Sequence, residues 1–194
     1  KDGIREKFYD NLLSSKFDCS TKFLDIKNKD FAETNKILAG SLLEAIGKNN
    51  LNTDVFKNFR GVRRRFETVF QNSQFTIIDD FGHHPTAIEK VAMKAEKDFD
   101  DLVLIVEFAS NTMKSGLHDK KLKKIFSNRK TFLINASSEQ TNLFNNSVIL
   151  SKTNLSEVLN KKESDHLAIL MCSNKQFMGI QNDLISFISS QSDE

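Results

Sequence analysis

Residues that could do chemistry gather in one short stretch, residues 79–84, which reads DDFGHH and is followed by the only proline of the chain, Pro85. Two carboxylates and two imidazoles this close together could bind a metal, exchange protons or hold a polar substrate. Neighbouring residues on a loop need not converge, however, and the stretch has no H-x-x-x-H spacing and no third ligand. A zinc site is therefore disfavoured, and we expect no metal ligands here.

The surroundings of this stretch favour a ligand-binding loop. FTIIDD, residues 75–80, predicts a strand that ends on carboxylates, and Thr86 with Glu89 matches a capping box at the start of a helix. Residues 81–85 would then lie between a strand end and a helix N-terminus, where open α/β sheets bind ligands and free N–H groups favour anions. A carboxylate there could accept ribose hydroxyls. The alternative is that Asp79 and Asp80 are turn and cap residues with no ligand.

Two further polar stretches follow apolar runs. Residues 107–116, EFASNTMKSG, come after the run at 102–106 and carry short donors and acceptors that could orient an amide or a carboxylate: Ser110, Asn111, Thr112 and Lys114. Ser173 and Asn174 come after the run at 167–171. Either stretch alone could be an ordinary loop, but three polar loops at equivalent strand ends imply one shared crevice.

Arginines are concentrated in the segment FRGVRRRFE, residues 59–67. We expect this run to lie on a strand, with Arg63 and Arg65 on one side and Arg64 on the other. One or two guanidiniums directed at the strand ends would suit a polyphosphate, although a charge run is usually a solvated face. Nucleic acid is disfavoured because aromatic interleaving and surplus positive charge are both lacking.

The apolar pattern predicts an α/β fold with an open, mostly parallel, Rossmann-like sheet. Continuous apolar runs indicate strands buried on both faces, and helical spacing lies between them. The runs occupy residues 75–78, 102–106, 131–134, 148–150 and 167–171. Residues 63–71 should form an antiparallel hairpin with the first run, and helices should cover both faces of the sheet.

Residues before the hairpin follow a different pattern. ETNKILAGSLLEAIG, residues 33–47, predicts a helix that ends at Gly47. We place a domain boundary near residue 59, so that residues 1–58 are the end of one domain and residues 59–194 form another. The near miss GSLLEAIGKN does not fit a phosphate loop, so this chain should not carry one.

Composition is ordinary for a globular protein, with 194 residues, 39% hydrophobic residues and a formal net charge of +2. Cys19 and Cys172 form no C-x-x-C pair, which fits a reducing cytoplasm, and no apolar run approaches the length of a membrane span. The chain does not begin with methionine and starts within an expected helix, which suggests that a preceding part is missing.

Four strings in this order resemble the C-terminal domain of the Mur ligases: NFRGVRRRFE, IIDDFGHHPTAI, EFASNTMKSGLH and MCSNKQFMGI. The string DDFGHHPT is similar to that of the muramate-linking members, and SNTMK to that of the peptide-recycling murein peptide ligases. The resemblance covers about residues 31–190. It assigns residues 1–58 to the end of the family's central ATP-binding domain and residues 59–194 to its C-terminal domain.

The resemblance implies an ATP-dependent amide-bond ligase of peptidoglycan recycling, acting in cell-wall biogenesis and cell shape. Such an enzyme joins the tripeptide L-Ala-γ-D-Glu-meso-diaminopimelate to UDP-N-acetylmuramate through an acyl phosphate, with charge offset by Mg²⁺ and protein cations. ATP and Mg²⁺ would be held mainly by upstream Mur ligase domains, and this chain alone should be inactive. No nucleic acid or membrane partner is implied.

The family pattern also implies roles for individual residues. Arg65 would contact an ATP phosphate and Asp80 the ribose, while His83 and His84 would lie beside the nucleotide and the incoming amine. Catalytic roles would thus fall to Asp80, His83 and His84. The peptide pocket would be shaped by Asn111, Thr112 and Lys114, with Ser173 and Asn174 on its far side.

Several positions depart from the family pattern. The peptide-recycling ligases usually read E-P-R-S-N-T-M, whereas Phe108 and Ala109 stand here in place of the proline and the arginine. A glycine-rich S-N-G-G-F-G-G-I becomes SNKQFMGI, residues 173–180, and the usual His-Asn pair becomes Phe31 and Ala32. Two alternatives therefore remain open: a UDP-N-acetylmuramate:L-alanine ligase, and a remnant that binds peptide or nucleotide without catalysis.

Overall fold

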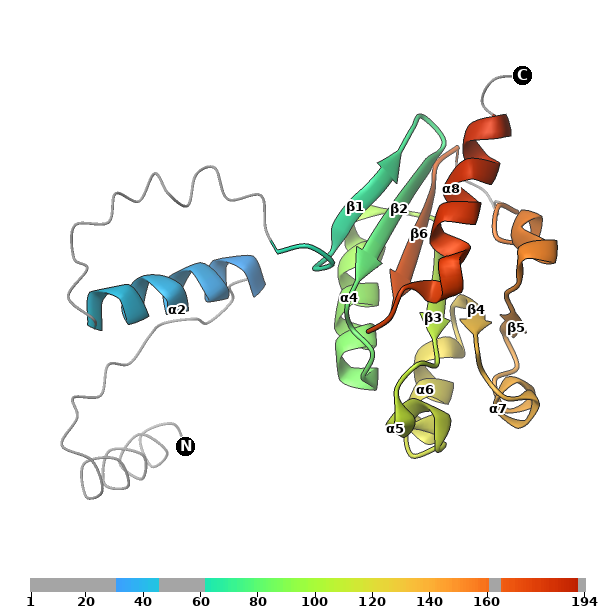
Figure 1. Cartoon of the computed structure of the whole chain (residues 1–194), viewed down its shortest axis with the longest axis horizontal. Helices are drawn as coiled ribbons and strands as arrows, with labels where there is room; N and C mark the ends of the chain where they lie inside the picture. The colour runs from blue at the N-terminus through green and yellow to red at the C-terminus, as the bar shows by residue number, and fades with distance from the viewer. Residues whose placement is uncertain (1–30, 46–61, 161–164, 192–194) are drawn as a thin grey trace. The chain divides into compact units, whose positions relative to one another are not determined.

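The computed structural model describes residues 31–45, 62–160 and 165–191 (Figure 1). The chain divides into two compact units, Lys1–Arg60 and Gly61–Glu194. In the first unit, helix α2 (Phe31–Ala45) confirms the helix expected from residue 33, while the expected end at Gly47 lies outside the described residues. The assignment of residues 1–58 to a central ATP-binding domain stays a prediction.

The second unit is built on a sheet of six strands in the order β1-β2-β6-β3-β4-β5. The strands are β1 (Glu67–Gln71), β2 (Phe75–Asp80), β3 (Leu102–Glu107), β4 (Lys130–Ile134), β5 (Ser147–Ile149) and β6 (Leu167–Cys172). β1 is antiparallel to β2, and every other neighbouring pair is parallel. This confirms the predicted mostly parallel sheet that opens with a hairpin.

The turn of the hairpin is closed by one side chain. Oδ1 of Asn72 accepts hydrogen bonds from the backbone N–H groups of Gln74 and Phe75, at 2.9 and 2.7 Å. Asparagine is favoured in turns because its short side chain can replace a backbone acceptor in this way. The turn therefore fixes where β2 begins.

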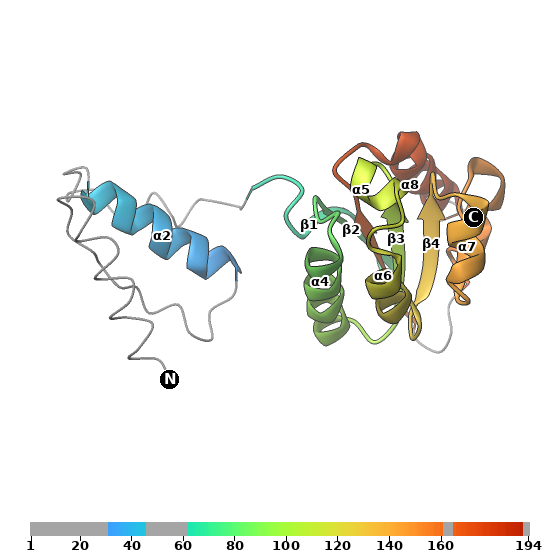
Figure 2. The same ribbon diagram turned by 90° about the horizontal axis from the view of Figure 1, so that it is seen from below.

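Helices cover both faces of the sheet, as predicted (Figure 2). α4 (Pro85–Asp98), the short α5 (Asn111–Lys114), α6 (Asp119–Phe126) and α7 (Ser138–Leu143) contribute to or border one buried cluster. The opposite cluster receives α8 (Ile180–Gln191) and two 3-10 turns, η1 (Lys152–Glu157) and η2 (Phe177–Gly179). Successive strand residues alternate between the clusters: Ile77 lies in one and Ile78 in the other.

Three local predictions were wrong. The expected strand at 63–71 begins only at Glu67, because residues 63–66 form turns with Arg64 and Phe66 at positive φ, 57° and 54°. Among the segments with helical spacing between the apolar runs, residues 152–157 form a 3-10 helix in place of the α-helix that the spacing of Leu155, Val158 and Leu159 predicts. Thr86 is not a capping residue, because α4 already begins at Pro85, a favourable first helical residue, and its N-cap is His84.

No helix within the described segments combines the length and the apolar character that crossing a membrane would require.

Candidate functional site

The carboxyl ends of three strands lie side by side. β6 is the neighbour of both β2 and β3, and all three are parallel. The register places Cys172 opposite Asp80 on one side and opposite Val106 on the other. The polar loops that follow these strands therefore emerge from the same edge of the sheet. We call residues 81–84, 108–118 and 173–179 the strand-end site.

Asp80, the expected ribose contact, is buried and bonded to backbone groups. Its Oδ2 accepts from the N–H of Phe66 at 2.9 Å, and its Oδ1 from the N–H of Gly82 at 2.7 Å. A Cβ on Gly82 would lie 2.8 Å from Asp80 Oδ1, so only glycine fits this approach without a shift. Asp80 thus ties the turn before β1 to the loop after β2, and its proposed contact with ribose stays a prediction.

Arg64 connects three segments of the site. Its Nε donates to both carboxylate oxygens of Asp79, at 3.2 and 3.0 Å, and its Nη2 donates to the carbonyl of Ser173 at 2.9 Å. The guanidinium also lies 5.6 Å from the ring centroid of Phe81. These contacts hold the backbone of Arg64 in its left-handed conformation, which explains why the arginine run is a turn and not a strand.

Arg65, the expected phosphate contact, is exposed, and its guanidinium lies 5.3 Å from the centroid of Phe81. Arg64 and Arg65 thus both approach the same aromatic ring, a cation–π arrangement. Unlike Arg64, Arg65 keeps its charge toward solvent, where an anion could reach it. Arg63 is exposed as well, and Arg60 lies outside the described residues.

The histidines expected at the reacting end occupy different environments. Nδ1 of His83 lies 3.0 Å from the carbonyl oxygen of Phe81. The exposed ring of His84 makes an edge contact with His118, at a centroid distance of 4.6 Å and an interplanar angle of 73°. The pKa of His84 is lowered, first by desolvation and then by the charge of His118, with smaller effects of Lys121 and His83. The lowered pKa favours the neutral imidazole, which can accept a proton.

His118 was missed at the sequence level. It belongs to the string EFASNTMKSGLH and precedes α6. In sequence it lies 34 residues after His84. The signal available was its place at the end of a polar stretch that follows a strand, but only the packing of α4 against α6 brings the two imidazoles together.

The segment after β3 exposes the residues expected to contact the peptide. Ser110 caps α5, since its Oγ accepts from the N–H of Met113 at 3.3 Å, and it lies 3.2 Å from Thr112 Oγ1. Met113 is buried, while Asn111, Thr112 and Lys114 are exposed. One buried methionine therefore anchors a short helix whose polar side chains remain accessible to a ligand.

Ser173 and Asn174 differ in what they can offer a ligand. The hydroxyl of the buried Ser173 donates to Glu107 and accepts from the N–H of Lys175 at 2.8 Å. Oδ1 of Asn174 is buried and has no hydrogen-bond partner. An orphaned buried acceptor is costly, so a donor from a ligand or water would stabilise it. The placement of both residues in a peptide pocket stays a prediction.

Glu107 was also missed at the sequence level. It is the last residue of β3 and is 3% exposed, and its Oε2 accepts from Ser173 and from the N–H of Phe177 at 2.9 Å. A carboxylate that ends an otherwise apolar run was the available signal. Its partners could not be found from the sequence because they depend on β6 lying next to β3.

The described segments contain no group of three histidine, cysteine, aspartate or glutamate side chains that could hold a metal ion. These residues alone therefore do not fit a Mg²⁺ cage. That Mg²⁺ is held by phosphates and by other domains stays a prediction.

Known proteins resemble this chain in sequence and in fold. No protein-family model matches it. The UDP-N-acetylmuramate–L-alanine ligase of Lawsonia intracellularis is 43% identical over 51 residues, which are 26% of this chain and 11% of that enzyme. A murein peptide ligase structure from Psychrobacter arcticus is 26% identical, with a TM-score of 0.59, over 79% of this chain and 36% of the other.

Two structures from Thermotoga maritima share the fold at lower identity. A UDP-N-acetylmuramate–alanine ligase is 15% identical, with a TM-score of 0.63, over 83% of this chain and 38% of the other. MurF ligase in complex with ADP is 10% identical, with a TM-score of 0.58, over 78% and 37%. In local sequence and in fold, this chain is therefore similar to Mur ligases.

The second unit has the α/β fold of Mur ligase C-terminal domains, which confirms the predicted fold class. The chain spans only part of its Mur ligase relatives: the matched lengths are 11% of the curated enzyme and 36 to 38% of the three structures.

Proposed function

We propose that this chain is the amino-substrate side of an ATP-dependent ligase that joins L-Ala-γ-D-Glu-meso-diaminopimelate to UDP-N-acetylmuramate in the cytoplasm. It would act in peptidoglycan recycling together with upstream Mur ligase domains that bind ATP and the muramate substrate. The observation that carries the proposal is the grouping of the three polar loops at the ends of β2, β6 and β3. Substrates of open α/β sheets bind at such strand ends.

The nucleotide side of the proposal depends on Arg65 and Asp80. Arg65 is exposed and its guanidinium lies 5.3 Å from the centroid of Phe81, so its charge can meet a phosphate. Each oxygen of Asp80 accepts one backbone N–H and keeps a further lone pair, but Asp80 is 4% exposed, so a ribose hydroxyl would reach it only if the surrounding loop moved. Asp80 would then act mainly by holding the loop after β2 in place, and residues of that loop would contact the nucleotide.

The peptide side depends on His84 and on the exposed face of α5. A neutral imidazole at His84 could accept the proton that the attacking amine loses as the C–N bond forms and phosphate leaves. His83, with Nδ1 toward the Phe81 carbonyl, would present its other ring nitrogen to the same space. Asn111, Thr112 and Lys114 would bind the amides and carboxylates of the peptide, facing Asn174.

A UDP-N-acetylmuramate:L-alanine ligase is the second candidate, because the local sequence match is to enzymes of that name. The two candidates share every step except the amino substrate. The string SNTMK, residues 110–114, favours the tripeptide.

The proposed function is tested with the full-length protein, ATP, Mg²⁺ and UDP-N-acetylmuramate. Tripeptide and free L-alanine are supplied together, and the products are identified by mass. The tripeptide product should dominate, and Arg65→Ala should raise the KM for ATP about tenfold, the loss of a charge-assisted contact. Arg63→Ala, which removes an exposed neighbouring arginine, should leave the KM for ATP within about twofold.

Dominance of the L-alanine product would select the second candidate. A protein that binds tripeptide but forms neither product would instead be a binding remnant of the family, and the ligase proposal would be wrong.

A further inference from the structure

The left-handed turn that precedes α8 contains two residues that are not glycine. Phe177, Met178 and Gly179 are consecutive residues with positive φ, at 53°, 53° and 83°. An L-residue other than glycine is destabilised in this region by crowding between its Cβ and the backbone, so Phe177 and Met178 hold a backbone that the chain would not adopt alone. Something in the surroundings must impose the turn.

Glu107 holds the turn from the β3 side. Its buried Oε2 accepts from the N–H of Phe177 at 2.9 Å and from the hydroxyl of Ser173. Hydrogen bonds to an ionised acceptor are about twice as strong as neutral ones, and more so away from water. One carboxylate thus fixes both ends of the segment between β6 and the turn.

Arg64 holds the same segment from the β2 side. Its Nη2 donates to the carbonyl of Ser173 at 2.9 Å, and its guanidinium lies 5.5 Å from the centroid of the buried Phe177 ring. The segment from Ser173 to Phe177 is therefore held between two charged side chains, Glu107 at the end of β3 and Arg64 in the turn before β1. Such a segment is preorganised before any ligand arrives.

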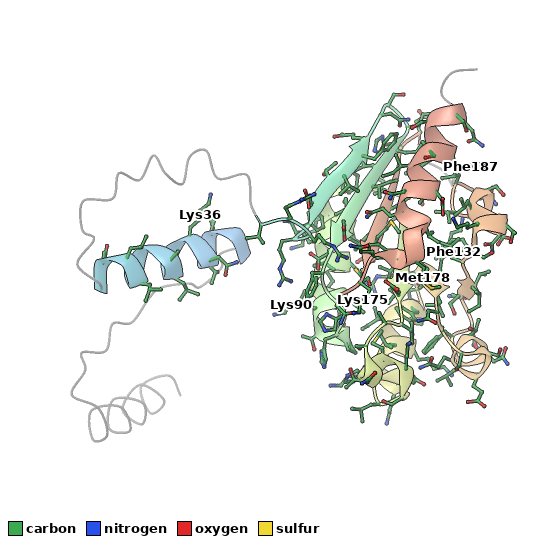
Figure 3. The ribbon with its side chains drawn as sticks, viewed as in Figure 1. Lys36, Lys90, Phe132, Lys175, Met178 and Phe187 are labelled. Carbon is green, nitrogen blue, oxygen red and sulfur yellow. The ribbon has the colours of Figure 1, made fainter. Side chains whose placement is uncertain are left out.

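The turn presents two exposed side chains at the strand ends. Lys175 is exposed and Met178 is 67% exposed, and both lie near the start of α8 (Figure 3). The unpartnered Oδ1 of Asn174 immediately precedes Lys175. The geometry of the turn therefore decides where an amide, a cation and a thioether face the site.

We propose that Glu107 is a positioning residue, which imposes the left-handed turn at residues 177–179 and thereby places Asn174, Lys175 and Met178 as the wall that selects the amino substrate. The choice of the amino substrate as the selected ligand rests on the proposed function. The imposition of the turn does not, and the two parts can be tested separately.

Amide hydrogen exchange of this chain tests the turn directly. In Glu107→Ala the amide of Phe177 should exchange about tenfold faster or more, since a charge-assisted hydrogen bond is lost, while the amide of Ile105 within β3 keeps its rate. Glu107→Gln retains a carbonyl acceptor and should recover most of the protection. If Glu107→Ala fails to fold, Glu107→Leu fills the same volume without an acceptor. Equal acceleration at Phe177 and Ile105, or none at either, overturns the proposal.

Kinetics of the full-length protein test the selection. Glu107→Ala should raise the KM for the amino substrate about tenfold, leave the KM for ATP within about twofold, and be rescued by Glu107→Gln. A purely structural role would lower the amount of active enzyme and leave both KM values unchanged, which would contradict the proposal. If the wild-type protein forms no product, the proposed function fails, and the exchange experiment still decides whether Glu107 imposes the turn.

Discussion

The imidazole rings of His84 and His118 pack edge to face at 4.6 Å, although one residue caps α4 and the other precedes α6. This contact places a second titratable ring beside the histidine that the proposed function uses. It also connects the loop after β2 with the segment after β3. The protonation of His84 therefore depends on a residue outside the DDFGHH stretch.

His118→Ala should raise the pKa of His84 toward 6.5, because a positive neighbour and part of the desolvation are both removed. NMR titration of the imidazole resonances measures the shift. An unchanged pKa of His84 would show that His118 does not influence it.

The same lowered pKa predicts a pH dependence of stability. A histidine whose pKa is lower when folded binds more protons when unfolded, so its contribution is present above the unfolded pKa of about 6.5 and is lost as pH falls through the folded pKa. The free energy of unfolding of His84→Gln should therefore fall less steeply between about pH 6.5 and pH 5 than that of the wild type. Parallel curves would contradict this.

Met178→Gly should stabilise the chain by about 0.5–1 kcal/mol, because glycine adopts positive φ freely while part of the gain is offset by greater freedom when unfolded. Met93→Gly is the matched control, since Met93 is also exposed but lies in α4, where glycine costs about 1 kcal/mol. Chemical denaturation measures both. Destabilisation by both variants would mean that the backbone at Met178 carries no strain.

Arg64→Ala should destabilise the chain by about 2 kcal/mol, because the buried carboxylate of Asp79 loses its ion pair. Arg63→Ala is the matched control and should change the free energy of unfolding by less than about 0.5 kcal/mol, since Arg63 is exposed. If both variants changed the free energy of unfolding equally, the contacts of Arg64 would not stabilise the fold.

Cys172 should not react with thiol reagents in the native chain. It is fully buried, and its thiol pKa is raised well above the usual value by burial, with the charges of Asp80 and Asp79 adding to the effect. A Cys19→Ser variant leaves Cys172 as the sole thiol. Labelling should follow unfolding by denaturant, and rapid labelling of the folded protein at pH 8 would contradict the burial.

The strands and their polar ends could be predicted from the sequence, because buried parallel strands are continuous apolar runs and their boundaries are marked by charge. FTIIDD became β2, for example, and LAILM became β6, which extends one residue further to Cys172. The long-range partners could not be predicted. Glu107 meets Ser173 and Phe177 only because β6 lies beside β3, and nothing in the apolar pattern fixes that order of strands.

The turn at Arg64 was missed for a related reason. Three successive arginines between apolar residues are typical of a strand, and residues 63–66 contain no glycine that would indicate a left-handed turn. The backbone nevertheless becomes left-handed at Arg64 and Phe66. Tertiary bonds from Asp79, Asp80 and Ser173 decide the conformation there. Local propensity is outweighed wherever buried charges converge, and the strand-end site is such a place.

The position of β6 between β2 and β3 also governs how the chain can fold. β6 is the last strand in sequence but lies between β2 and β3 in the sheet. Asp80 of β2 pairs with Cys172 of β6, which is 92 residues further along the chain. Contacts this distant in sequence make folding slow. During synthesis, β2 and β3 would each present an unpaired edge until β6 has emerged from the ribosome. A chain truncated before Leu167 should therefore aggregate and not retain a partial sheet.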